Sequence, residues 1–203
     1  IDIKSVAHLL LPSCIKERIR SSLYQNNKLK NHLSIAFHDA RRSIGGNYEP
    51  LAISGKTYEA YREWEQRWSM IKTQLEEYQA KSVLDIGCAE GWFLRRAAED
   101  LGCFALGIEL STRMLAPEIA RLHDEVERLA IMKTEVNAKN LVDLPQCDVV
   151  LCLSVVHHII REEGIEVAKA FVRAITEIAK KAIIFEMGTS EEYEMEWYEQ
   201  LPA

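Results

Sequence analysis

The chain has 203 residues, of which 48% are hydrophobic and 28% charged, as is usual for a globular protein with a sizeable core. No apolar run approaches the roughly 18 residues that span a bilayer, so the sequence argues against a membrane span and favours a cytoplasmic location. Residues 1–50 carry eight Lys/Arg and four Asp/Glu, whereas residues 51–203 carry 17 and 27. No basic stripe lies beside the glycine-containing turn described below, which disfavours a long nucleic-acid substrate.

The five cysteines predict buried thiols rather than a disulfide framework or a metal site. They are Cys14, Cys88, Cys103, Cys147 and Cys152, and no two of them form a C-x-x-C pair. Cys147 and Cys152 lie in or beside one apolar run that is typical of a buried strand.

The N-terminal part of the chain predicts helices. Apolar residues recur at helical spacing in residues 3–24 and 29–43, and Gly45-Gly46-Asn47 then favours a helix end. We therefore expect an N-terminal helical extension over residues 1–56, with a loop at 44–56. Thr57 can cap a long helix to about Gln79. This helix either packs on a sheet or on the N-terminal helices, or it forms a lid whose ligand-facing side chains are Tyr58, Tyr61, Arg62 and Arg67.

From Ser82 onwards, short apolar runs alternate with helical patterns. The runs are Ser82–Ile86, Phe104–Glu109, Leu129–Lys133, Asp148–Leu153 and Lys181–Glu186, and the helical patterns cover residues 91–101, 111–126 and 164–180. Strands that alternate with helices predict an α/β fold with a doubly wound, mostly parallel sheet. Residues 57–203 are expected to form this domain.

The turn after the first apolar run distinguishes between two kinds of ligand. It reads Asp85-Ile86-Gly87-Cys88-Ala89-Glu90-Gly91-Trp92. A dinucleotide fold needs a third glycine for close helix packing where this chain has Trp92. The charge of Asp85 would also oppose a pyrophosphate, whereas it suits a ligand with a cationic amino group.

This turn resembles the first motif of the class I S-adenosylmethionine-dependent methyltransferases, an apolar strand followed by D/E-x-G-x-G-x-G. Ala89 stands where the family has its middle glycine, a departure that we expect to cost little. The resemblance implies that Asp85 lies near the cofactor's amino group, that Glu109 at the end of the second strand binds the ribose hydroxyls, and that Glu135 and Val136 lie beside adenine. The full set of expected S-adenosylmethionine-binding residues is Asp85, Gly87, Cys88, Ala89, Gly91, Trp92, Glu109, Leu110, Glu135, Val136, Leu153 and Ser154.

A second motif follows the fourth apolar run, where Leu153-Ser154-Val155-Val156 leads into His157-His158. By the same resemblance, Ser154 lines the cofactor and one histidine faces the acceptor. A histidine with a pKa near neutrality is a suitable general base for a hydroxyl or amine. Either histidine can fill this role, with a preference for His158, or one of them simply begins a helix. Glu186, at the end of the fifth run, could also face the crevice.

Residues 67–197 also resemble the methyltransferase domain of the kinase–methyltransferases that terminate O-antigen polysaccharide chains. The shared residues are Arg67-Trp68-x-x-Ile71, Leu84-Asp85-x-Gly87-Cys88-Ala89-x-Gly91-x-Phe93 and Leu153-Ser154-Val155-x-His157-His158-Ile159. Those enzymes methylate a terminal phosphate. The class I sheet normally continues into an antiparallel hairpin, for which this sequence has no room after Glu186. The fifth strand would then be an edge that can pair with another chain.

The sequence therefore predicts a methyltransferase that acts on an oxygen or nitrogen of a small-molecule or glycan-type acceptor. One alternative is an RNA or tRNA methyltransferase, supported by the basic balance of residues 1–50. Another is a catalytically silent, cofactor-binding partner subunit.

Overall fold

The computed structural model describes residues 49–53, 56–58, 63–110 and 126–187. The chain divides into two compact units, Ile1–Ile44 and Gly45–Ala203, and all described residues belong to the second. The helices expected at residues 3–24 and 29–43, and nearly all of the one expected at 111–126, lie outside the described residues. The domain division at residue 56 stays a prediction.

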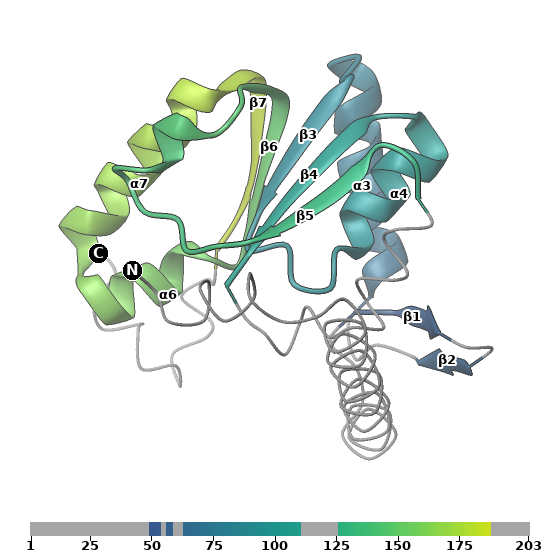
Figure 1. The fold of residues 1–203 in the computed structure, drawn as a ribbon, viewed down its shortest axis with the longest axis horizontal. Coiled ribbons are helices and arrows are strands. Elements are labelled where there is room, and N and C mark those ends of the chain that lie inside the picture. The colour runs from purple at the N-terminus through teal and green to yellow at the C-terminus, as the bar shows by residue number, and fades with distance from the viewer. Residues whose placement is uncertain (1–48, 54–55, 59–62, 111–125, 188–203) are drawn as a thin grey trace, which may run out of the picture. The chain divides into compact units, whose positions relative to one another are not determined.

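Five parallel strands form the sheet, in the order β5-β4-β3-β6-β7 (Figure 1). Their bounds are β3 Ser82–Ile86, β4 Phe104–Glu109, β5 Leu129–Lys133, β6 Cys147–Leu153 and β7 Ala179–Glu186. The order runs outward in one direction from β3 to β5 and in the other from β6 to β7, so the predicted doubly wound parallel sheet is confirmed. Among the described strands, β7 pairs only with β6, and association with another chain through that edge stays a prediction.

Helices cover both faces of the sheet (Figure 1). On one face α3 (Trp64–Glu77) and α4 (Trp92–Leu101) pack on the strand residues Val83, Ala105 and Val149. On the other face α6 (Val156–Glu163), α7 (Ile165–Ile178) and the short helix η1 (Leu141–Asp143) pack on Leu84 and Val150. Neighbouring residues of each central strand point to opposite faces, and both faces are buried, which explains why these strands are almost wholly apolar.

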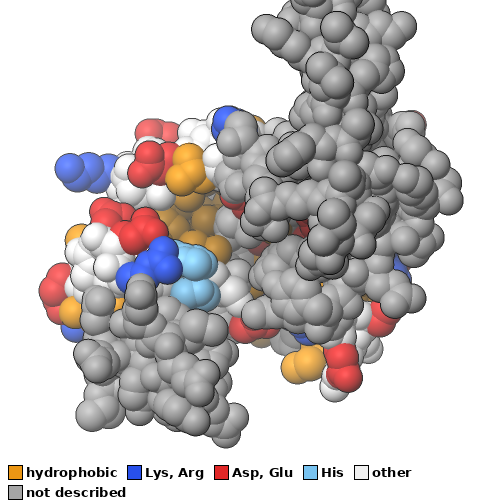
Figure 2. Space-filling view, turned by 90° about the horizontal axis from the view of Figure 1, so that it is seen from below, with side chains coloured by type: hydrophobic (Ala, Val, Ile, Leu, Met, Phe, Trp, Pro, Cys, Tyr) orange, Lys and Arg blue, Asp and Glu red, His pale blue; other side chains and the backbone are white. Residues whose placement is uncertain are grey.

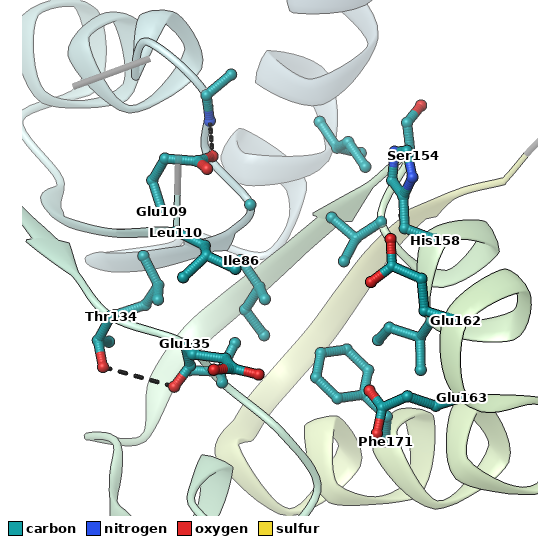
Figure 3. Close-up of a pocket in the computed structure, with 17 residues that line it drawn as sticks. Ile86, Glu109, Leu110, Thr134, Glu135, Ser154, His158, Glu162, Glu163 and Phe171 are labelled. Carbon is teal, nitrogen blue, oxygen red and sulfur yellow. Dashed lines mark hydrogen bonds between the residues drawn. The ribbon is translucent and has the colours of Figure 1, made fainter. Parts of the chain in front are cut away.

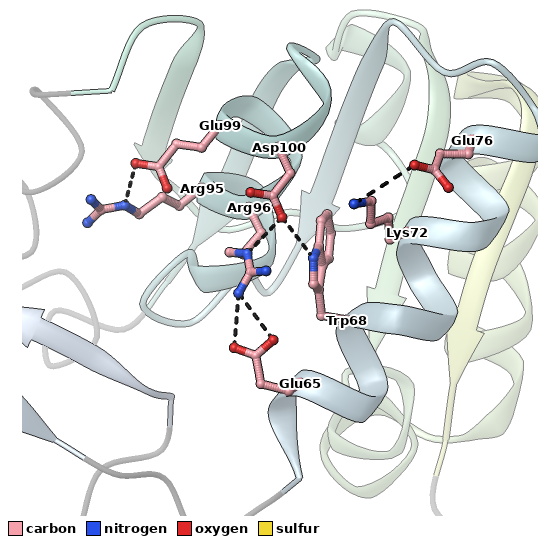
Figure 4. A network of polar contacts seen from close by, with 8 residues as sticks. All are labelled: Glu65, Trp68, Lys72, Glu76, Arg95, Arg96, Glu99 and Asp100. Carbon is pink, nitrogen blue, oxygen red and sulfur yellow. Dashed lines mark hydrogen bonds and ion pairs between the residues drawn. The ribbon is translucent and has the colours of Figure 1, made fainter.

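Helix α3 is fastened to α4 by a network of polar contacts (Figure 4). The indole Nε1 of Trp68 donates to Asp100 Oδ2 at 3.1 Å, and Arg96 Nε donates to the same oxygen at 2.9 Å. Arg96 Nη1 also donates to Glu65 Oε1 at 2.9 Å. These contacts hold α3, which precedes the sheet in sequence, in a defined position beside the glycine turn.

The expected loop at residues 44–56 and the start of the expected helix from Thr57 to Gln79 are both wrong, because a β-hairpin lies there. Residues Leu51–Ile53 (β1) pair antiparallel with Lys56–Tyr58 (β2), and α3 begins only at Trp64. Two β-type runs separated by Ser54-Gly55 in the sequence are a hairpin signal that outweighs the capping preference of Thr57. Of the side chains expected to form a lid, Tyr58 lies in β2 and not in the helix. Tyr61 and Arg62 lie outside the described residues.

Helix α6 was expected only as the alternative in which one of the two histidines begins a helix, and both lie in its first turn. Helix α7 ends at Ile178, because β7 begins two residues earlier than its apolar run indicates. None of the described helices is long and apolar enough to cross a membrane. The described cysteines, Cys88, Cys103, Cys147 and Cys152, are free and buried.

Candidate functional site

The turn after β3 has a backbone that favours glycine. Gly87 has a φ of 74°, and a Cβ placed on it would lie 2.5 Å from Cγ2 of Val155, so any side chain there would clash with the loop after β6. Ala89 has a φ of 50°, in the left-handed region. An L residue is less stable there by about 1 kcal/mol, so glycine would adopt this conformation more readily than Ala89 does.

A pocket of about 550 Å³ opens at the carboxyl ends of the strands (Figure 3). Such crevices hold ligands in doubly wound folds, and the volume is in the range of small-molecule sites. The expected site residues that line it are Gly87, Ala89, Glu109, Leu110, Glu135, Val136, Leu153, Ser154 and His158. The others, Asp85, Cys88, Gly91, Trp92 and His157, are not among its described lining residues.

Trp92 is part of an aromatic cluster between α3 and α4. Its ring meets Trp64 and Trp68 edge-on, with centroids 5.9 and 6.5 Å apart. The third glycine of a dinucleotide fold is therefore replaced by a packing residue. Cys88 is buried beneath the same turn.

Glu109 forms one wall of the pocket, at the end of β4 (Figure 3). Its Oε2 accepts a hydrogen bond from the Ala89 backbone N–H at 2.9 Å. This bond joins the glycine turn to the neighbouring strand end and fixes a carboxylate at the pocket surface. A carboxylate held in this way can accept hydrogen bonds from two adjacent hydroxyls.

Asp85 is 3% exposed at the end of β3, and no hydrogen bond to its carboxylate is found in the part of the chain that the structure describes. Burial, helped by the charge of Glu109 and opposed by the charge of Arg67, raises the pKa of this carboxyl from 3.8 to about 7. A buried carboxylate of this kind is stabilised by a cation, such as a ligand's amino group.

The opposite wall comes from α6 and α7, with His158, Ile159, Glu162, Glu163 and Phe171 facing the pocket. In Figure 2, histidine side chains border an apolar hollow and acidic side chains lie nearby. Burial and the charge of Arg161 lower the pKa of His158, which favours the neutral, proton-accepting imidazole at pH 7. The His157 ring lies 4.2 Å from that of His158, centroid to centroid.

Glu49 is a site residue that sequence reasoning missed. It is 2% exposed, and its Oε2 accepts the Trp92 backbone N–H at 3.0 Å, at the start of α4. Its own backbone N–H donates to Glu90 Oε2 at 3.1 Å. Burial raises its pKa well above the usual value, and the nearby Glu90 adds to the shift. A lone glutamate 36 residues before Asp85 gives no sequence signal of this contact.

The electrostatics of this crevice disfavour a phosphate. In dinucleotide folds the N-terminus of this helix faces the pyrophosphate, whereas here a carboxylate occupies it. None of the described lining residues is Lys or Arg, and four of them are Glu. No group of three His, Cys, Asp or Glu side chains within the described ranges could hold a metal ion.

Asparagine at position 85 is expected to stabilise the unliganded protein at pH 8. The folded state raises the pKa of Asp85, so it binds a proton that the unfolded chain releases, and stability falls as pH rises from about 4 to about 7. One pKa unit is about 1.4 kcal/mol. Because asparagine must also be desolvated, we expect a gain of roughly 2 kcal/mol for Asp85→Asn at pH 8.

Urea unfolding of wild type and variant at pH 5 and pH 8 measures this gain. Asp148→Asn is the control, and we expect it to destabilise the protein. A hydrogen bond from the Lys81 N–H lowers the pKa of Asp148, so the folded state favours its charged form. An Asp85→Asn gain that is no larger at pH 8 than at pH 5 would refute the assigned shift.

Comparison with known proteins agrees with this geometry. Residues 84–181 match a family described as a methyltransferase domain. A tRNA U34 carboxymethyltransferase of Desulfotalea psychrophila (strain LSv54 / DSM 12343) is 33% identical over 64 residues, which are 32% of this chain and 20% of the relative. This chain thus corresponds to only a fifth of that relative's length.

Many solved structures share the fold, and two of them illustrate the similarity. The bifunctional kinase-methyltransferase WbdD aligns with a TM-score of 0.60 and 22% identity, over 70% of this chain and 33% of its own. The N-terminal domain of EvdMO1, determined in the presence of SAH and D-fucose, aligns with a TM-score of 0.52 and 15% identity, over 71% of this chain and 60% of its own.

Proposed function

We propose that this chain, whose residues 84–181 form a methyltransferase domain of the class that uses S-adenosylmethionine, methylates an oxygen or nitrogen of a small-molecule or glycan-type acceptor. The observation that carries the proposal is the pocket at the strand ends, with a fixed carboxylate, Glu109, on one wall and a histidine, His158, on the other. The chain spans about a third of the length of WbdD. Its activity and its acceptor are therefore proposed here and are not taken over from WbdD.

The described residues fit the cofactor. Glu109 would bind the ribose hydroxyls, and Asp85 would receive the amino group of the methionine part. Leu110, Glu135 and Val136, which line the pocket next to Glu109, would surround adenine. S-adenosylmethionine supplies a methyl group on a positively charged sulfur, which is a good leaving group. The acidic, phosphate-excluding surroundings of the crevice support a cationic cofactor over a dinucleotide.

On the acceptor side, His158 would take the proton from a hydroxyl or amine. Its lowered pKa keeps the imidazole neutral at pH 7, so it can accept a proton without first losing one. Ser154 and Leu153, at the end of β6, would separate cofactor from acceptor and help to align them. A phosphate or carboxylate acceptor would need no base, and His158 would then donate a hydrogen bond.

A methyl-transfer assay tests the acceptor class. Incubation with tritiated S-adenosylmethionine and panels of amines, monosaccharides and oligosaccharides is expected to label at least one member, with equimolar release of S-adenosylhomocysteine. Labelling confined to bulk tRNA would contradict a small-molecule or glycan acceptor. Cofactor binding with no labelling of any panel would favour a catalytically silent partner subunit, held to another chain through the β7 edge.

A tRNA acceptor is the second candidate, favoured by the similarity to a tRNA U34 carboxymethyltransferase. Binding to a phosphate backbone weakens steeply as salt rises. tRNA binding that falls at least tenfold between 50 and 200 mM salt would support this candidate, and the absence of basic side chains among the described pocket residues argues against it.

A further inference from the structure

Ser154 holds a backbone conformation that serine rarely adopts. It follows β6 directly and lines the pocket, and its φ of 59° lies in the left-handed region. The Cβ atom makes this region unfavourable for residues other than glycine, so surrounding contacts must hold Ser154 there. Strained residues of this kind cluster at functional sites, where the strain fixes a geometry that a relaxed turn would not give.

Glu186, at the end of β7, supplies two of these contacts. Its backbone carbonyl accepts the Ser154 N–H at 2.9 Å, and its Oε1 accepts the Ser154 hydroxyl at 2.6 Å. Arg67, on α3, fixes the same carboxylate, because its Nε and Nη2 donate to both oxygens of Glu186 at 2.9 to 3.2 Å. The Arg67 guanidinium carbon lies 4.6 Å from the ring centroid of Trp64 and 5.1 Å from that of Phe93. One carboxylate thus ties Ser154 to α3 and to the aromatic side chains beside it.

Ser154 stands where the glycine turn and the histidine-bearing helix meet. The next residue, Val155, packs on the glycine turn, since a Cβ on Gly87 would lie 2.5 Å from its Cγ2. The Val155 carbonyl accepts the N–H of His158 at 2.9 Å, in the first turn of α6. Ser154 and His158 both lie on the wall opposite Glu109 (Figure 3). The direction in which the chain leaves Ser154 therefore sets the position of the His158 ring relative to the glycine turn.

We propose that Glu186 is a positioning residue for methyl transfer, which keeps Ser154 in the left-handed conformation and thereby places the base His158 at its working distance from the cofactor. Arg67 holds the Glu186 carboxylate in the orientation that this role requires. Glu186 itself is not among the described residues that line the pocket, so it acts through Ser154. This inference rests on the proposed function and on His158 as its base.

Three single variants give a pattern that a simple ligand contact would not. Glu186→Gln loses the charge that pairs with Arg67. We expect kcat to fall about tenfold to 100-fold, while KM for S-adenosylmethionine changes less than threefold, because a misplacement of about 1 Å costs about that much in rate. Ser154→Ala removes the hydroxyl and keeps the Cβ, so a similar loss is expected. Ser154→Gly also removes the hydroxyl, but glycine adopts positive φ readily, so its kcat should exceed that of Ser154→Ala at least threefold.

Combined and control variants test the route through Ser154. Glu186→Gln should lower kcat by less than a further threefold when it is added to Ser154→Ala, because both changes break the same contact. Arg67→Lys keeps the charge without the planar fork, and its kcat should lie between those of wild type and Glu186→Gln. Lys181→Met breaks an ion pair at the other end of β7, where Lys181 Nζ lies 3.3 Å from Asp148 Oδ2, and should leave kcat unchanged.

Amide hydrogen exchange of the ligand-free chain supplies a readout that needs no acceptor. Glu186→Gln and Ser154→Ala should speed the exchange of residues 154–158 severalfold and leave β3 and β4 as in wild type. Unchanged exchange at residues 154–158, a Ser154→Gly variant as impaired as Ser154→Ala, or losses that multiply in the double variant would overturn the inference. A wild type that methylates no acceptor, although exchange responds as expected, would instead overturn the proposed function, and the catalytic role of Glu186 with it.

Discussion

Replacing Glu109 with alanine is expected to weaken S-adenosylhomocysteine binding about 100-fold. A hydrogen bond to a charged group contributes about 1.5–3 kcal/mol, and Glu109 can form two with a ribose. The same carboxylate anchors the Ala89 N–H at 2.9 Å, so its loss also frees the glycine turn. About 3 kcal/mol in total corresponds to a change of about 100-fold in the dissociation constant.

Calorimetry on wild type, Glu109→Ala and Glu109→Gln measures this effect, with the glutamine variant expected in between. Glu99→Ala is the matched control, because Glu99 lies on the exposed side of α4 and pairs only with Arg95 among the described residues. An affinity of Glu109→Ala within threefold of wild type would remove Glu109 from the cofactor site.

Replacing His158 with alanine is expected to lower turnover about 100-fold to 10,000-fold while cofactor affinity changes less than threefold. General bases contribute rate factors of about 10² to 10⁴. His158 lines the pocket on the wall opposite Glu109, so its removal should affect the chemical step and spare the ribose contacts. The smaller effect is expected for His157→Ala, because His157 is not among the described lining residues.

The pH profile of turnover separates base catalysis from packing. Since burial and Arg161 lower the pKa of His158, the acidic limb of the wild-type profile should lie below pH 6.5, and it should vanish in His158→Ala. The conservative His158→Gln tests a hydrogen-bonding role. Full turnover of His158→Gln would contradict a base and would fit an acceptor that is already ionised.

The core of the domain could be predicted from sequence because its signals are local. The apolar runs of β3, β4 and β6 need burial on both faces, which only the centre of a parallel sheet provides. Glu109 could be singled out because the resemblance to class I methyltransferases implies an acid at the end of the second strand, where ligands bind in such sheets. His158 could be identified as a candidate but not separated from His157, because the orientation of α6 decides between them.

The contacts that complete the site could not be predicted, because their partners are far apart in the chain. Glu49 reaches the Trp92 N–H from 43 residues away, and Arg67 reaches Glu186 from 119. Glu49 belongs to no motif, and the shared residues Arg67-Trp68-x-x-Ile71 do not indicate that Arg67 contacts Glu186. The left-handed backbone of Ala89 and Ser154 is likewise set by tertiary contacts rather than by residue type.

The most direct test of the account is calorimetric titration of the folded wild-type chain with S-adenosylhomocysteine, with NADH as the competing ligand class. The pocket at the strand ends, its Glu109 carboxylate and the carboxylate at the start of α4 predict micromolar binding of S-adenosylhomocysteine and none of NADH. Binding of NADH, or of neither ligand to a folded sample, would contradict the assignment of this crevice to S-adenosylmethionine.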